Sequence, residues 1–219
     1  MCTNYRPGSR DFIRERFALE ADFDYVAETY PAYRAPVIVR APQGRACVAA
    51  GFGMIPPWAR DAKIARSTYN ARSETVAEKP SFRHAWRQAQ FCLVPMQCFY
   101  EPSYESGRAV RWRIEAADGA GFCVAGIWEC WRAPTQELLH TFSMLTVNAD
   151  GHPLMRKFHA PGDEKRSIVV IGPQRYDDWL GADGASAHGL LANFDAAAFV
   201  AAPDPRLPAA RKQAAASAA

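Results

Sequence analysis

The sequence has little that would place the protein in a membrane or outside the cell. It contains no run of about 18 or more apolar residues, which is what a membrane-spanning helix requires. Its first residues, Met-Cys-Thr-Asn-Tyr-Arg-Pro, lack the apolar centre of a secretory signal peptide. We therefore expect a cytoplasmic protein without a membrane partner.

The cysteines lack the spacing of a zinc site. Five residues separate Cys92 from Cys98 and six separate Cys123 from Cys130, whereas structural zinc is usually held by two close pairs of Cys or His. Thiols in the cytoplasm are also kept reduced. We therefore expect free cysteines, no metal ion and no cofactor.

A strong excess of basic residues is missing too. The formal net charge is only +3, which permits a nucleic-acid partner without requiring one. Hydrophobic residues make up 49% of the chain, enough for one sizeable core, and we find no repeat or linker in the first 200 residues. We expect a monomer with one domain over residues 1–206. The Ala-rich tail, residues 207–219, is expected to be disordered.

Short apolar runs bounded by Gly or Pro predict strands at 35–39, 91–95, 122–128, 142–147 and 167–171. The clearest helical candidate is 73–90, where Ser73 is a good N-cap and Pro80 should kink the helix or divide it. Further helices are expected at 10–19, 22–28 and 174–181. The sequence thus predicts an α+β fold, mainly β, with a helix after the Asn-Ala-Arg segment.

The second residue is a cysteine, and initiator methionine is commonly removed before a small side chain. Removal of Met1 would give Cys2 two nucleophiles, an α-amine with a pKa near 7.7–8.0 and a thiol with a pKa near 8.5. Such an aminothiol condenses with an aldehyde to an imine, and the thiol then closes a thiazolidine ring. The alternative is an incidental cysteine near a frayed terminus.

Glu101 is a second candidate because it follows the apolar run Cys-Leu-Val-Pro and the pair Phe-Tyr. In a partly desolvated site its pKa would rise, which suits a carboxyl group to general acid–base catalysis. The alternative for Glu101 is a solvated loop charge.

Seven segments in order resemble the SRAP family, the SOS-response-associated peptidases. They are Met1-Cys2, 53–58 (Gly-Met-Ile-Pro-Pro-Trp), 70–75 (Asn-Ala-Arg-Ser-Glu-Thr), 92–101 (Cys-Leu-Val-Pro-Met-Gln-Cys-Phe-Tyr-Glu), 124–129 (Val-Ala-Gly-Ile-Trp-Glu), Thr146 and 159–161 (His-Ala-Pro). The sequence departs from the family at Thr3, which replaces Gly, at Pro102, which replaces Trp, and at Pro161, which replaces an arginine.

The resemblance implies a protein that senses abasic sites in single-stranded DNA. Cys2 would form a covalent thiazolidine with the C1′ aldehyde of the ring-opened deoxyribose and so shield the lesion in the DNA damage (SOS) response. By the same resemblance Asn70 holds the terminal amine or thiol, Glu101 shuttles protons, and His159 assists sugar ring opening, with His152 as second choice. The family name implies a hydrolase or protease step that frees Cys2, and lyase activity is a further implication.

Single-stranded DNA is expected to lie in a shallow basic groove. Phosphate contacts give affinity without sequence choice, and aromatic side chains stack on any base. The expected DNA-binding residues are Arg72, Trp58, Pro57, Arg6 and Arg156, with Pro56, Arg111 and Arg113 near them. For Trp58 the alternative is packing in the core, and for Arg6, Arg111 and Arg113 the favoured alternative is a solvated charge on the surface. The phosphate contact of the arginine that Pro161 replaces would be lost, or taken by Arg156, Lys157 or Arg166. On damaged DNA the protein would be nucleoid-associated.

Two other functions remain open. In the first, Cys2 is the nucleophile of an amide hydrolase and its own amine is the base. In the second, the protein is a non-catalytic module that binds single strands and Cys2 is idle. A hydrolase turns over amides, the abasic-site hypothesis predicts one denaturant-resistant adduct per protein, and the idle-cysteine hypothesis predicts that Cys2→Ala keeps all function.

Overall fold

The strands of the protein join into one sheet that closes on itself. The computed structural model describes residues 2–206, and within them the sheet has eleven strands. These are β1 (Tyr5–Pro7), β2 (Arg34–Ala41), β3 (Gly44–Phe52), β4 (Asn70–Arg72), β5 (Phe91–Ser103), β6 (Val110–Ala116), β7 (Phe122–Arg132), β8 (Leu138–Asn148), β9 (Arg166–Ile168), β10 (Val170–Ile171) and β11 (Phe199–Pro203).

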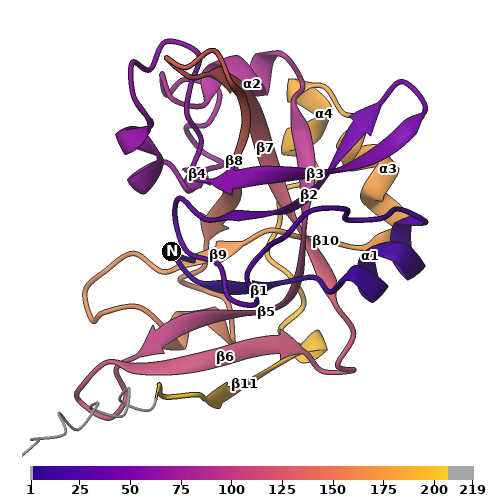
Figure 1. Cartoon of the computed structure of the whole chain (residues 1–219). Coiled ribbons are helices and arrows are strands. Elements are labelled where there is room, and N and C mark those ends of the chain that lie inside the picture. Colours follow the sequence, from indigo (N-terminus) through magenta and orange to yellow (C-terminus); the bar gives the residue numbers. More distant parts are fainter. Residues whose placement is uncertain (1, 207–219) are drawn as a thin grey trace, which may run out of the picture.

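A barrel is closed by β5, which pairs with both β2 and β7. The ring continues from β7 to β8, from β8 to β3 and from β3 back to β2. The first half of β5, Phe91 to Met96, lies against β7, whereas Cys98 to Ser103 leave the ring and pair with β6. In Figure 1 this second half forms a lower layer with β1, β6 and β11.

Short helices flank the barrel, most of them at its right-hand side in Figure 1. They are α1 (Arg10–Phe17), α2 (Arg83–Arg87), α3 (Tyr176–Leu180) and α4 (Gly184–His188), with 3-10 turns η1 (Ala62–Arg66), η2 (Met155–Lys157), η3 (Pro173–Arg175) and η4 (Ala196–Ala198). Ser9 caps α1, which buries Ile13 and Phe17. Trp179 of α3 is fully buried, and its indole N–H donates to the carbonyl of Cys92 in β5. Helix α3 thus helps to fix the ring half of β5.

The α+β, mainly β prediction is confirmed, including the five predicted strand regions and the helices at 10–19 and 174–181. The helix predicted at 22–28 is wrong. Arg10 donates to the carbonyl of Ala21, just before this segment, and to that of Phe23 within it, so a side chain occupies backbone acceptors that the first turn of a helix would use. The predicted tail 207–219 lies outside the described residues.

Only the end of the region 73–90 is helical, as α2. Residues 73–82 form successive turns. The Ser73 N–H donates to the carbonyl of Thr146 in β8, so Ser73 extends the pairing of β4 and caps no helix. Pro80 has no N–H to donate, and its ring would clash with the carbonyl four residues earlier. The proline thus delays the helix until Arg83.

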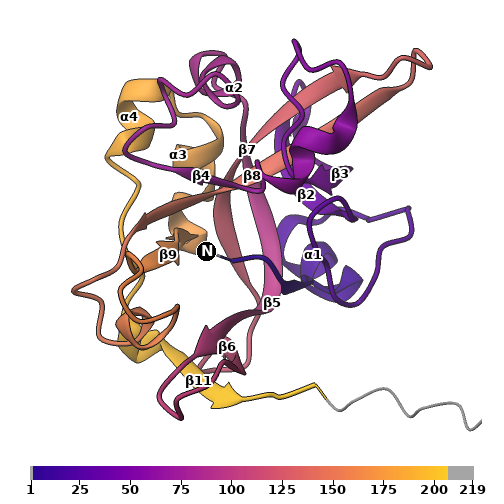
Figure 2. The same cartoon turned by 90° about the vertical axis from the view of Figure 1, so that its left-hand side faces the viewer.

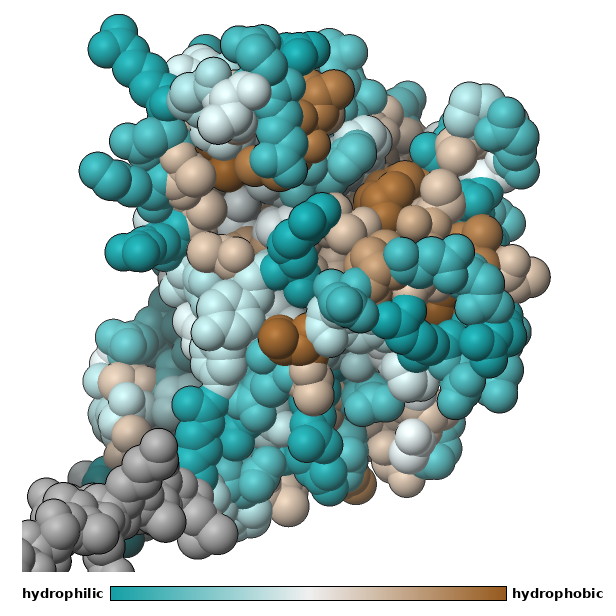
Figure 3. All heavy atoms as spheres, in the orientation of Figure 1, coloured by the Kyte–Doolittle hydropathy of each residue, from teal (hydrophilic) through white to brown (hydrophobic). Residues whose placement is uncertain are grey.

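No helix within residues 2–206 is long and apolar enough to cross a membrane. Over the same range, no group of three or more His, Cys, Asp or Glu side chains could hold a metal ion. On the face shown in Figure 3, apolar residues form separate patches among hydrophilic ones.

Candidate functional site

Cys2 is buried although it stands at the start of the described chain. Its side chain is 1% exposed, and its thiol donates to the carbonyl of Asn4 over 3.6 Å. Asn70, at the start of β4, donates its side-chain N–H to the carbonyl of Cys2 at 2.8 Å. In both cartoon views the beginning of the chain lies beside β9, between the barrel and the lower layer (Figures 1 and 2). Burial raises the pKa of the Cys2 thiol far above its usual range, with a further contribution from the nearby charge of Glu101.

Glu101 lies in the second half of β5, opposite Trp112 of β6. Its side chain is 3% exposed, so the solvated loop charge considered from the sequence is excluded. Burial raises the pKa of Glu101 to about 7. A carboxyl group with this pKa both gives and takes protons at neutral pH.

His159 meets Glu101 from the loop that follows η2. Its Nε2 lies 3.3 Å from Oε2 of Glu101, and its backbone N–H donates to the carbonyl of Pro102 at 3.0 Å. The backbone of His159 is left-handed, with φ at 67°. Burial lowers its pKa to about 4, with a smaller effect from the Lys165 ammonium. The imidazole is therefore neutral at physiological pH.

His152, the second choice from the sequence, has a structural role. It is buried, its Nδ1 accepts the N–H groups of Leu154 and Met155, and its Nε2 lies 2.8 Å from the carbonyl of Phe194. Because Nδ1 is the acceptor, Nε2 carries the proton and donates it to that carbonyl. Both nitrogens are thus engaged by the backbone.

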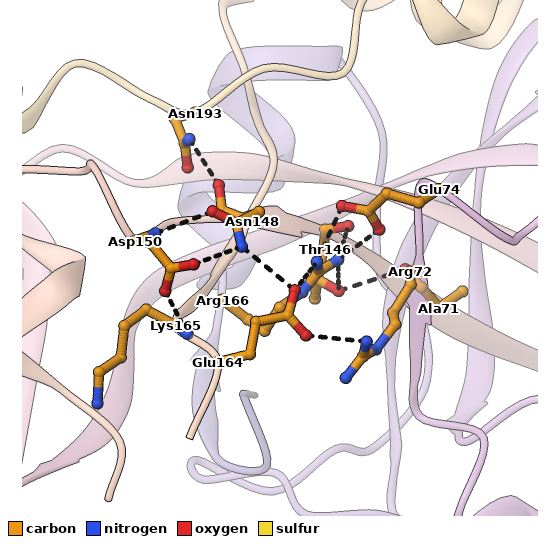
Figure 4. Close-up of polar contacts among 10 residues, drawn as sticks. All are labelled: Ala71, Arg72, Glu74, Thr146, Asn148, Asp150, Glu164, Lys165, Arg166 and Asn193. Atoms are coloured by element: carbon orange, nitrogen blue, oxygen red, sulfur yellow. Dashed lines mark hydrogen bonds and ion pairs between the residues drawn. The ribbon is translucent and has the colours of Figure 1, made fainter. Parts of the chain in front are cut away.

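An ion-pair network joins the His159 loop to β4 (Figure 4). Arg166 is 3% exposed in its side chain; it binds both carboxylate oxygens of Glu74 at 2.9 Å, Glu164 at 2.8 Å and the carbonyl of Thr146 at 2.7 Å. Glu164 also pairs with Arg72 at 2.9 Å. Arg166 therefore has a structural role. Of the three residues considered as replacements for the arginine that Pro161 replaces, Arg166 is the one whose guanidinium is already used within the fold.

The predicted DNA-binding residues occupy different surfaces. Trp58 is 57% exposed, which excludes packing in the core, and its indole N–H donates to the carbonyl of Pro80. Pro57 and Arg156 are exposed as well, whereas Pro56 is buried. Arg72 has a half-exposed side chain at the end of β4, two residues after Asn70.

Arg6 and Arg113 line a cleft of about 460 Å³ beside α1, together with the acidic residues Asp11, Glu15 and Glu115. A different groove, of about 660 Å³, opens onto Glu101 and is lined by Thr3, Asn4, Tyr30, Tyr100, Arg108, Arg111 and Arg206 among others. Arg6 and Arg113 are therefore not brought together with Arg111 at the groove that holds Glu101.

Sequence reasoning missed Asn4, Lys165 and Glu164. Lys165 donates from its ammonium to the carbonyls of His159 and Ala160, at 3.3 and 2.8 Å, and so supports the left-handed turn. Asn4 carries no recognisable motif. Its proximity to Cys2 was the only available signal. All six cysteines are free, as expected.

Comparison with known proteins decides the family. A family model described as SOS response associated peptidase (SRAP) matches residues 1–203. The chain belongs to the SRAP family. Among curated SRAP relatives, abasic site processing protein YoqW of Bacillus subtilis (strain 168) is 32% identical over 149 residues, which is 66% of this chain and 63% of that protein. Abasic site processing protein HMCES of Mus musculus is 27% identical over 127 residues, 45% of this chain and 36% of that protein.

The chain spans less than two thirds of the length of these curated SRAP relatives. A crystal structure of a protein from Bordetella bronchiseptica is similar over 94% of this chain and 100% of that one, with a TM-score of 0.88 and 36% identity. Another, from Bacteroides thetaiotaomicron, covers 91% of this chain and 90% of its own, with a TM-score of 0.78 and 23% identity. The second likeness concerns the fold alone.

Proposed function

We propose that this SRAP protein captures abasic sites in single-stranded DNA through a thiazolidine crosslink to Cys2, after Met1 has been removed. The observation that carries the proposal is the convergence of Cys2, Asn70, Glu101 and His159 from four separate segments. Asn70 contacts Cys2 at 2.8 Å and His159 contacts Glu101 at 3.3 Å. Several curated relatives are named abasic site processing proteins, which supports the same substrate.

The reaction begins at the amine because burial favours neutral groups. Because Cys2 is buried, we infer that its α-amine reacts in the neutral, unprotonated form, while burial raises the pKa of the thiol so that the thiol keeps its proton. The amine nitrogen adds to C1′ of the aldehyde, and loss of water gives an iminium ion. Sγ then adds to C1′ and closes the ring, while the thiol proton leaves. Aldehyde and aminothiol thus become thiazolidine and one water.

Glu101 serves both proton transfers in this scheme. With a pKa of about 7 it protonates the leaving hydroxyl group of the carbinolamine and later accepts the thiol proton. A positioned acid–base group contributes typically about 10²–10⁴-fold to such steps. Neutral His159, next to Glu101, takes the proton of the C1′ hydroxyl as the C1′–O4′ bond breaks and passes it to O4′, so that the ring opens to the aldehyde with no net change in protons.

Asn70 orients the nucleophile in two ways. Its N–H holds the carbonyl of Cys2, and its Oδ1 is buried without a hydrogen-bond partner among residues 2–206. A buried acceptor without a partner costs about 1–3 kcal/mol. The α-amine of Cys2 supplies the missing donor once Met1 has left, and its lone pair is then directed toward C1′.

The side chains that hold DNA contact its phosphates and the faces of its bases, so binding does not depend on the base sequence. Arg72 beside Asn70 binds a phosphate, Trp58 and Pro57 stack on a base that flanks the lesion, and Arg156 binds the backbone near His159. We further propose that the protein acts in the cytoplasm on nucleoid DNA during the damage response.

The test uses purified full chain and a single-stranded oligonucleotide with one abasic site. We expect one adduct per protein that survives SDS, together with an intact mass that shows loss of Met1. Cys2→Ser, which keeps the amine but cannot close the thiazolidine, should give an adduct only after borohydride reduction. Absence of the SDS-resistant band from protein that lacks Met1 would refute the proposal.

The same samples separate the two alternatives. An amide hydrolase would release product repeatedly from a peptide and leave no adduct with DNA. A non-catalytic module would bind intact and abasic strands alike, and Cys2→Ala would retain its whole function.

A further inference from the structure

The buried position of Cys2 needs an explanation, because the first residues of a domain usually fray unless they are tied down. The strand that follows is short: β1 spans Tyr5–Pro7. Cys2 and Asn4 precede it, yet they are 1% and 6% exposed. Strand pairing alone does not account for the burial of this segment.

Asn4 connects Cys2 to the rest of the fold. Its carbonyl accepts both the N–H of Tyr100 at 3.0 Å and the thiol of Cys2 at 3.6 Å. Its side-chain N–H donates to the carbonyl of Thr29 at 3.2 Å, and its Oδ1 accepts from Arg111 at 3.0 Å. Every polar group of the Asn4 side chain is thus directed by a partner.

Arg111 of β6 is the hub of these contacts. Besides Asn4, its guanidinium binds Glu28 at 2.7 Å and the carbonyl of Asp204 at 3.4 Å, and it lies 3.4 Å from the ring centre of Tyr100. Its side chain is only 20% exposed. Because both terminal nitrogens meet protein acceptors, Nε is buried without a partner among residues 2–206, and one face is covered by a ring, this guanidinium is poorly placed to bind phosphate.

We propose that Arg111 is a positioning residue that fixes Cys2 against Glu101 by holding Asn4. A planar guanidinium fork suits this task, since it binds an amide oxygen and a carboxylate at the same time while it stacks on a ring. The restraint of Cys2 by Arg111 does not depend on what the protein binds. The role of Arg111 in crosslinking rests on the proposed function.

The first experiment requires no DNA. Full-length wild type, Arg111→Ala, Arg111→Lys and Asn4→Ala are treated with iodoacetamide, and labelling of Cys2 is followed by peptide mass spectrometry. We expect labelling to accelerate by about tenfold or more in all three variants, which corresponds to local opening made easier by about 1.4 kcal/mol. Arg14→Ala is the matched control, because Arg14 also binds two carboxylates, Asp11 and Glu20, but on the exposed face of α1.

Labelling at the wild-type rate in folded Arg111→Ala would overturn the proposal. If Arg111→Ala does not fold, Asn4→Ala decides, since it leaves the pair between Arg111 and Glu28 intact.

The second experiment separates positioning from phosphate binding. With protein in excess over abasic DNA, we expect Arg111→Ala to crosslink on the order of 10–100-fold more slowly. In a Cys2→Ala background, the same change should leave the affinity for single-stranded DNA within about twofold and its salt dependence unaltered. The double variant with Asn4→Ala should be no slower than Arg111→Ala, because both act through one contact.

Lower affinity with a reduced salt slope would make Arg111 a phosphate ligand and overturn the positioning role. If wild type forms no adduct, the proposed function fails, while the labelling result still decides whether Arg111 restrains Cys2.

Discussion

The buried carboxyl of Glu101 should make the protein less stable as the pH rises. Folding raises its pKa from 4.5 to about 7 because burial disfavours the charged form. Below pH 4.5 the carboxyl is protonated in both the folded and the unfolded chain. Between pH 4.5 and 7 the folded chain binds more protons, so the free energy of unfolding falls. Above pH 7 the full cost is present, about 3 kcal/mol at about 1.36 kcal/mol per pKa unit.

The perturbation is Glu101→Gln, which keeps the shape and cannot ionise. Urea denaturation at pH 5 and pH 8.5 gives the free energy of unfolding of each protein. We expect the stability of Glu101→Gln relative to wild type to increase by up to about 3 kcal/mol from pH 5 to pH 8.5. Glu137→Gln, at an exposed turn between β7 and β8, is the control and should show no such change. A relative stability of Glu101→Gln that is equal at the two pH values would refute the reasoning.

Three further changes have defined outcomes. Asn70→Ala removes the bond to Cys2 and should slow crosslinking by about fivefold in a gel time course, since such a bond contributes about 1 kcal/mol. Trp58→Ala should weaken binding of single-stranded DNA by about 1–3 kcal/mol in a fluorescence titration, without lowering the melting temperature, because the indole is exposed. Arg166→Met leaves Glu74 and Glu164 without their shared partner. Because these two carboxylates are 48% and 35% exposed, water takes over much of the lost contact, and we expect the free energy of unfolding to fall by about 1–2 kcal/mol in urea; a loss under about 0.5 kcal/mol would contradict the structural role.

The sequence predicts the strands well where apolar runs are short and bounded. The run at 91–95 marks the ring half of β5, but the strand continues to Ser103, so Glu101 lies within β5 and not after it. Local composition could not predict this, because the second half of β5 is extended through its pairing with β6, where Glu101 lies opposite Trp112. Local propensity likewise favoured a helix that begins at Ser73. In the structure the backbone N–H of Ser73 instead donates to the carbonyl of Thr146, a long-range hydrogen bond that keeps this residue out of a helix.

The site was predicted in part because its motifs are local in the sequence. Cys2, Asn70, Glu101 and His159 each stand in a recognisable segment. The contact between Asn4 and Arg111 joins residues 107 positions apart with no pattern at either end. Such a contact depends on the register of β6 against β5, which periodicity alone leaves undetermined.

The left-handed backbone of His159 has an evolutionary consequence. A residue other than glycine at φ 67° carries about 1–2 kcal/mol of strain, which a glycine would relieve. His159→Gly would therefore relieve this strain, and it would remove the imidazole and its contact with Glu101 in the same step. Selection for thermal stability alone has no use for the strained backbone at this position, so we expect variants with glycine there among those selected for heat resistance. Retention of His159 in such a library would indicate that the catalytic role of the imidazole was under selection as well.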